Sequence, residues 1–356
     1  MTALALRAAV ARSGPTVVWR TGPLSLRFRL RTAVVVAVLV GLTLLTALVA
    51  LGLGDYQVSV PDVARALVGD GPARIRTLVV NWRLSRVVLG VLVGIALGVS
   101  GAIFQSLTRN PLGSPDIVGF SSGAYSGALV AIVMVGASQQ NIIVGALAGG
   151  AATAVAVYLL AYRRGVEGFR LIVVGIAITA MLGSANTYLL LHTDLWRAQL
   201  AAVWGAGSIN GLDWPEVRAI GLTLAIALPL ALIAGRRLSV LEMGDDAAAG
   251  LGVRVEAIRL SLVLLGVALV AVPSALAGPI EFVALAAPHI ARGLTRGVGA
   301  QLVPSALVGG LLVVACDALA QHLFAPTILP VGLVTIVFGG AYLTWLIAVQ
   351  LRRESR

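Results

Sequence analysis

Three carboxylates stand close together in the segment VLEMGDDAAAGLGV at residues 240–253, namely Glu242, Asp245 and Asp246. Carboxylates of this kind could bind a divalent cation, but such sites usually take more oxygen ligands, and no histidine lies nearby. Two other interpretations stay open, an ordinary connector and an element that docks on a partner. The glycines Gly250 and Gly252 predict two short helices that are broken at this point.

Few ionisable residues fall inside the apolar stretches, and the candidates are Glu281, Asp317 and His322. A charge at bilayer depth is costly and usually functional, and such groups would suit proton or sodium coupling. Glu281 and Asp317 fall close to the ends of apolar stretches, so we do not expect a proton relay. His289 and Arg292 are three residues apart and share one helical face. We interpret His289 as a packed residue rather than a metal ligand.

These residues belong to a chain that is too apolar for a water-soluble protein. Hydrophobic residues make up 59% of its 356 residues, charged residues only 12%, and its mean hydropathy is +0.98. A soluble core cannot hide that much apolar surface. The sequence therefore predicts an all-α polytopic membrane protein with spans of ~20 residues. About ten such stretches are present, at roughly 32–53, 84–106, 115–136, 140–161, 170–191, 215–235, 257–278, 280–295, 300–323 and 329–350.

The basic residues indicate the orientation in the membrane. All 26 are arginine, and with a cytoplasmic N-terminus 19 of them fall in inner segments and 7 in outer segments, as the positive-inside rule requires. We expect both termini in the cytoplasm, an arginine-rich tail over residues 1–31, one transmembrane domain over 32–356 and a cytoplasmic loop at about 236–257.

The lack of lysine and the single cysteine exclude two kinds of functional site. A Walker A loop needs a lysine to reach the nucleotide phosphates, and the chain contains no lysine. Any ATP that drives this protein is therefore hydrolysed by another subunit. The one cysteine, Cys316, excludes an internal disulfide and a cysteine-rich metal site. We expect no catalytic residue, metal, cofactor or nucleic-acid partner.

Small residues and prolines mark the second stretch and its end. Small residues let transmembrane helices approach closely, so we interpret their spacing as helix packing, with a pathway-lining face as the alternative. The glycines concerned are Gly90, Gly94, Gly98 and Gly101. In RNPLGSPD, Pro111 and Pro115 disfavour helix before them, and Asn110 and Asp116 could cap helix starts.

Long motifs follow one another along almost all of the chain after its first 30 residues. They are WRLSR at 82–86, SGAIFQ at 100–105, RNPLGSPD at 109–116, SSGA at 121–124, LEMGDDAAAGLGV at 241–253, AGPIEFVALAAPHIAR at 277–292, CDALAQ at 316–321 and LPVGLVT at 329–335. Together they resemble the permease subunits of type II ATP-binding-cassette importers, the FecCD family that takes up ferric siderophores, haem and cobalamin. Within the family, SGAIFQSLTRNPLGSPDIVGF, FRLIVVGI and GAGSINGLDW resemble most the second permease subunit of ferric-enterobactin importers.

The resemblance implies the type II permease fold. Residues 99–111 and 272–288 are weakly similar, since each has a span end of small residues followed by a proline, and we interpret them as an inverted repeat. The resemblance also implies four partners, namely a second, different permease, a cytoplasmic ATPase dimer, an extracytoplasmic binding protein and a ferric siderophore cargo. Arginines matching Arg83 and Arg86 receive glutamates of the binding protein. The ATPase would be coupled through Leu241, Glu242, Gly244, Asp245, Asp246, Gly250, Leu251 and Gly252. Pathway or gate candidates are Gln105, Asn110, Pro111, Glu281, Pro288, His289, Arg292, Asp317 and Gln321.

Two positions depart from the family pattern. Glu281 stands where the family more often has a small or neutral residue, and Gln321 stands where members often place a further arginine. We expect Glu281 to be paired or to discriminate cargoes by charge. The competing function classes are an ATP-driven siderophore permease, the same machine with haem or cobalamin as cargo, and an ion-coupled secondary transporter. Only the last requires carboxylate pairs at membrane depth and no docking loop.

Overall fold

The computed structural model describes residues 16–21, 24–54, 56–116, 119–162, 168–324 and 327–354. Residues 1–15 of the predicted tail lie outside the described residues. The rest of that tail includes a two-stranded antiparallel hairpin of β1 (Thr16–Thr21) and β2 (Leu24–Arg29), with Thr16 opposite Arg29. This hairpin is the one departure from an all-α fold among the described residues.

Helices account for nearly all other described elements, and each predicted apolar stretch contains one. They are α2 (Leu30–Gly52), α3 (Val60–Leu67), α4 (Ala73–Arg76), η1 (Thr77–Leu84), α5 (Ser85–Thr108), α6 (Phe120–Val130), η2 (Ala131–Val135), α7 (Gln139–Ala161), α8 (Gly168–Leu191), α9 (Leu195–Gly205), α10 (Trp214–Leu241), α11 (Asp245–Gly250), α12 (Val255–Ala277), α13 (Val283–Thr295), α14 (Leu302–His322) and α15 (Val331–Glu354).

The prediction of about ten apolar helical stretches is confirmed, with shorter apolar helices at Phe120–Val135 and Val331–Leu346 beside the long ones. Among the described residues, seven helices are long and apolar enough to cross a membrane. The segment of α6 and η2 has 11 and 5 residues and α13 has 13, so they reach only about 24 and 20 Å, short of the ~30 Å hydrocarbon core.

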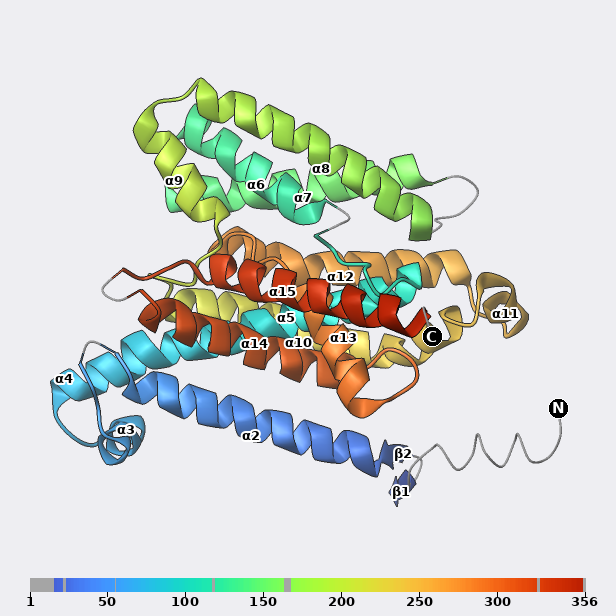
Figure 1. The fold of residues 1–356 in the computed structure, drawn as a ribbon, viewed down its shortest axis with the longest axis horizontal. Coiled ribbons are helices and arrows are strands. Elements are labelled where there is room, and N and C mark those ends of the chain that lie inside the picture. The colour runs from blue at the N-terminus through green and yellow to red at the C-terminus, as the bar shows by residue number, and fades with distance from the viewer. Residues whose placement is uncertain are drawn as a thin grey trace.

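The helices form layers around α5 (Figure 1). In this view α6, α7, α8 and α9 lie on one side, α2 lies on the other, and α5, α10 and α12 to α15 lie between. Helix α5 contacts α10, α12, α13 and α14. Figure 1 also places α11, the start of α2 and the C-terminus at one end of the molecule, and α3 and α4 at the opposite end.

Glycines bring α5 against its neighbours. A Cβ at Gly94 or Gly98 would collide with the backbone of Gly309 or Ser305 in α14, and a Cβ at Gly101 would collide with Ala284 in α13. These glycines are buried. Helix packing, not a pathway-lining face, therefore explains the glycine spacing of the second stretch.

Candidate functional site

The acidic loop forms one short helix between two long ones. Helix α10 continues to Leu241, Gly244 turns the chain with φ of 113°, α11 covers Asp245–Gly250, and Gly252 turns it again with φ of 78°. The predicted pair of short helices is therefore wrong, because the first of them is the end of α10. Gly250 lies inside α11 with open space around it, so Gly244 and Gly252 are the positions that need glycine.

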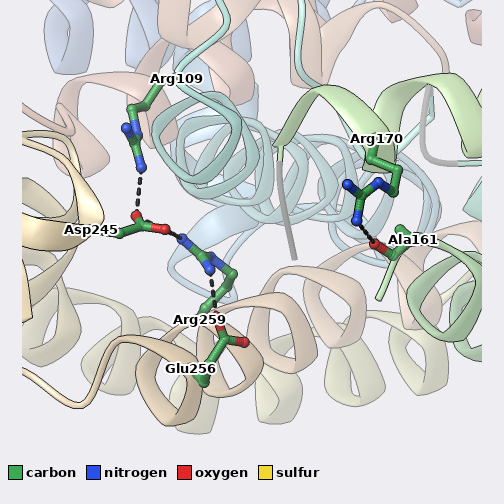
Figure 2. A network of polar contacts seen from close by, with 6 residues as sticks. All are labelled: Arg109, Ala161, Arg170, Asp245, Glu256 and Arg259. Carbon is green, nitrogen blue, oxygen red and sulfur yellow. Dashed lines mark hydrogen bonds and ion pairs between the residues drawn. The ribbon is translucent and has the colours of Figure 1, made fainter. Parts of the chain in front are cut away.

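Asp245 connects three elements (Figure 2). Its Oδ1 accepts a hydrogen bond from Arg109 Nη2 at 2.5 Å, and its carboxylate accepts two from Arg259 Nη2 at 2.8 and 2.9 Å. Arg109 ends α5, while Arg259 belongs to α12 and also donates to Glu256 at 2.8 Å. The carboxylate of Asp245 in α11 is thus bonded to the C-terminal end of α5 and to the first turns of α12, rather than only to solvent as expected for a solvated loop.

The arginines of this network were not predicted as site residues. Arg259 is only 6% exposed, and a buried guanidinium is stable only when its charge is paired. Arg109 is the C-cap residue of α5 and has a φ of 49°, in the left-handed region. Nearby, Arg170 begins α8 and donates to Ala161 O at 3.4 Å (Figure 2). The many arginines in the segments around Arg109 and Arg259 indicated that ion pairs would form there. The sequence did not show which carboxylate each arginine would meet.

Apolar side chains flank α11. Met243 is 68% exposed and Leu251 is 65% exposed, whereas Ala248 between them is buried. Asp246 is exposed, and no ion pair or hydrogen bond joins its side chain to a described residue. The loop around α11 therefore exposes apolar and acidic side chains to the surroundings, while Asp245 holds it against α5 and α12.

Two gate candidates, Gln105 and Arg292, join α5 to the short helix α13. Gln105 Nε2 donates to Leu285 O at 2.9 Å, and Arg292 donates to Gln105 Oε1. His289 Nδ1 lies 2.5 Å from the hydroxyl of Tyr342 in α15, which supports the interpretation of a packed histidine. Pro288 lies buried within α13. Helix α13 therefore contacts α5 through Arg292 and Gln105, and it contacts α15 through His289 and Tyr342.

The RNPLGSPD segment is a turn, but its predicted caps are wrong. Asn110 Oδ1 accepts from Leu112 N at 2.9 Å, which closes a turn of the Asx type. Asp116 accepts from the Ser121 hydroxyl at 2.5 Å, and the cap residue of α6 is Gly119, without a side-chain cap. Pro111 is exposed beside this turn.

At the opposite end of the molecule, Arg83 and Arg86 make contacts within the chain. Arg83 donates to the carbonyl of Leu51, in the last turn of α2, at 2.8 Å and to that of Tyr56, beyond the end of α2, at 2.6 Å. Arg86 and Asp317 form a two-bonded pair at 2.8 and 2.7 Å, and Gln321 Nε2 donates to the same Asp317 at 2.8 Å. The two arginines lie in a continuous helix over Ala73–Thr108 rather than before it.

A hollow of about 700 Å³ lies beside these arginines and is lined by Arg74, Trp82, Arg83, Arg86 and Gln321 among others. The structure therefore joins both docking candidates, Asp317 and Gln321 in one place. Glu281 lies elsewhere, in the chain between α12 and α13, where its charge acts on Asp116. No ion pair or hydrogen bond joins Glu281 to a described residue. A charged residue that pairs with it would therefore come from a partner subunit, and the expected pairing stays a prediction.

Comparison with known proteins identifies this arrangement. The model of the FecCD transport family matches residues 31–349. The chain belongs to the FecCD transport family. Its members include the ferric enterobactin permease FepG of Escherichia coli, which is 48% identical over 85% of this chain and 91% of its own length. The achromobactin permease CbrC of Dickeya dadantii is 37% identical over 94% of this chain and 97% of its own length.

A solved structure shares the fold of this FecCD chain. A metal-chelate type ABC transporter in an inward-facing conformation aligns with a TM-score of 0.80, covering 89% of this chain and 99% of its own, at 24% identity. The FecCD chain is therefore a multi-pass membrane protein with the fold of an ABC transporter permease.

Proposed function

We propose that this chain is the permease subunit of an ATP-driven importer that moves a ferric siderophore across the cytoplasmic membrane. The observation that carries the proposal is the 48% identity with a ferric enterobactin permease over 85% of the chain. An enterobactin-like or related ferric siderophore is the proposed cargo. The chain supplies the pathway, and a separate ATPase supplies the energy.

The proposed assembly pairs this chain with a second, different permease. Large apolar side chains remain exposed along α8, including Phe169 (78%), Met181 (67%) and Leu191 (77%), and along α15, including Val337 (68%) and Trp345 (60%). Lipid and a partner permease would cover these faces. In this proposal an ATPase dimer binds at the end that carries α11, and a binding protein delivers the cargo at the end that carries α3 and α4. The positive-inside bias of the arginines supports a cytoplasmic side for both termini.

In the coupling step, α11 enters a groove of the ATPase with Met243 and Leu251 as its apolar contacts. Movement of α11 reaches α10 and α12 through the chain. It reaches α5 through Asp245 and Arg109, whose side chains are joined at 2.5 Å. Because α5 also holds α13 through Gln105 and Arg292, the same movement would shift the inner gate.

At the outer end, Arg83 and Arg86 provide the positive charge on which acidic residues of the binding protein dock. Their internal contacts leave fewer free donors than two solvated arginines would have. Exposed charge pairs contribute only about 0.2–1 kcal/mol each and weaken with salt. Docking therefore depends on the basic hollow as a whole, with Arg74 as a further contributor.

The test is growth of a strain that lacks the gene, under iron limitation, with purified ferric siderophores supplied one at a time. Rescue by plasmid-borne permease with a ferric catecholate would support the proposal. Growth that is rescued only by haem, or only when cobalamin is the limiting nutrient, would show that the same type of importer carries haem or cobalamin instead. Uptake that continues with an inactive ATPase but stops with an ionophore would instead establish a secondary transporter.

A further inference from the structure

A small polar cavity, open on one side, lies away from α11 and from Arg83 and Arg86. Its volume is about 260 Å³, and it is lined by residues of α6, α8, the end of α9 and the chain between α12 and α13. The polar side chains on its wall are Ser121, Ser122, Tyr125, Thr179, Asn186, Thr187 and Glu281. Since α8 is one of the helices able to cross the membrane, this polar wall lies at membrane depth.

Hydrogen-bond acceptors are in excess at this cavity. Thr179 Oγ1 and Asn186 Oδ1 are buried and have no hydrogen-bond partner among the described residues. Asn186 as a whole is only 6% exposed. Buried polar atoms normally have partners, because leaving one unsatisfied costs the full desolvation of the group. Two such oxygens on one wall therefore indicate a ligand that interacts with oxygen lone pairs, either a hydrogen-bond donor or a cation.

The charge at the cavity points the same way. Glu281 lines it and has no ion pair or hydrogen bond with a described residue. Asp116 lies behind Ser121, bonded to that hydroxyl at 2.5 Å, and its Oδ2 has no partner in the described part of the chain. The charge of Glu281 also acts on Asp116, as a smaller effect than burial. Like charges repel more strongly in a low-dielectric site, and a bound cation offsets that repulsion.

We propose that this cavity binds a monovalent cation, Na⁺ or K⁺, through Glu281, Asn186 and Thr179. Oxygen ligands from one carboxylate, one amide and one hydroxyl suit a hard cation of low charge. A divalent ion generally takes more carboxylates, and no group of three or more His, Cys, Asp or Glu side chains that could hold a metal occurs among the described residues. The bound cation neutralises Glu281 and so lets an anionic cargo pass a carboxylate at membrane depth.

The site is tested on the assembled transporter with its partner permease and ATPase. Thermal unfolding is followed in NaCl, KCl and N-methylglucamine chloride at equal ionic strength, and binding is measured with radioactive Na⁺ or, for K⁺, with radioactive Rb⁺. We expect a higher unfolding midpoint in Na⁺ or K⁺ than in N-methylglucamine, and a saturable binding curve for the ion that stabilises.

Three variants connect the binding to these residues. Glu281→Gln should abolish saturable binding and the salt dependence of the midpoint. Asn186→Leu, which keeps the size of the side chain, should weaken binding by about tenfold or more through loss of one ligand to a charge. Asp70→Asn removes one exposed carboxylate at the outer end, where Asp70 accepts from Gly71 N, and should change neither measurement.

Equal midpoints in all three salts, or binding unchanged in Glu281→Gln, would overturn the proposal. An Asn186→Leu variant that is more stable yet binds the ion as wild type would also overturn it, because the orphaned oxygen would then be a packing defect. These results do not depend on which cargo the transporter carries, so the proposed siderophore import is tested separately.

Discussion

Asp245 is the residue through which the short helix α11 holds two long helices. It accepts from Arg109 and Arg259, while its neighbour Asp246 is exposed. The two residues have the same side chain and adjacent positions, so they form a matched pair for testing whether the network carries movement or only surface charge.

Asp245→Asn should lower cargo uptake per ATP hydrolysed, whereas Asp246→Asn should leave this ratio unchanged. The amide keeps the size of Asp245 but removes the charge that pairs the buried Arg259. Asp245 itself is about half exposed, so solvent weakens the effect, and Asp245→Glu should partly rescue the ratio. The measurement is uptake and ATPase activity in the same proteoliposomes. Equal ratios in both asparagine variants would contradict this role.

Arg86 and Asp317 form a second ion pair, at the end of the molecule opposite α11. This pair is more buried than that of Asp245, since its side chains are 16% and 6% exposed. Arg86→Glu places two carboxylates together, and breaking such a pair costs about 3–5 kcal/mol. We expect a lower thermal midpoint for Arg86→Glu and for Asp317→Arg, and recovery in the double swap. A single Arg86→Glu variant with the wild-type midpoint would contradict this expectation.

The double swap also permits a sharper docking test than reversal of Arg86 alone. If binding-protein capture falls in Arg86→Glu but returns together with stability in the swap, the loss came from misfolding. If capture stays low in the stable swap, Arg86 itself contributes to docking.

At the scale of elements, the loop around α11 is built on two left-handed turns. Gly244 and Gly252 have φ of 113° and 78°, and Gly250 lies in the helix. A residue with a Cβ is strained in the left-handed region by roughly 1–2 kcal/mol, and a β-branched one more so. Gly250 carries no such constraint.

Gly252→Val should therefore uncouple transport while leaving membrane insertion intact, and Gly250→Ala should transport as wild type. Alanine favours helix over glycine by about 0.8–1 kcal/mol, and nothing lies within 4 Å of a Cβ at Gly250. Uptake, ATPase co-purification and membrane yield are measured for both. Wild-type uptake by Gly252→Val, with normal co-purification, would show that the turn is not needed for coupling.

At the scale of the whole molecule, the fold places α11 and the described end of α15 opposite α3 and α4 (Figure 1). The orientation of this axis can be tested with cysteine labels, because the chain's one cysteine, Cys316, is only 6% exposed. Asp70 lies between α3 and α4 and Asp246 lies in α11, and both are exposed.

Asp70→Cys should react with a membrane-impermeant maleimide in intact spheroplasts, whereas Asp246→Cys should react only after lysis. The reason is the positive-inside bias of the arginines, which places the loop around α11 in the cytoplasm. Labelling of wild type gives the background from Cys316. Labelling of Asp246→Cys in intact spheroplasts, with none of Asp70→Cys, would reverse the proposed topology.

Composition and local spacing determined the class of this protein. Apolar runs predicted the membrane helices because each span must satisfy its own backbone hydrogen bonds, and glycine spacing predicted close packing. The long motifs predicted the family. These properties depend on residues near one another in the chain, which is why the sequence alone was sufficient for them.

Only the tertiary structure decided which distant charges meet. Arg86 bonds Asp317 and Arg109 bonds Asp245, yet the members of each pair are separated by more than a hundred residues. The structure likewise showed that Gly250 lies within a helix. Such outcomes follow from how whole helices pack, because the partner of a buried charge is whichever group the packing brings within a few ångströms.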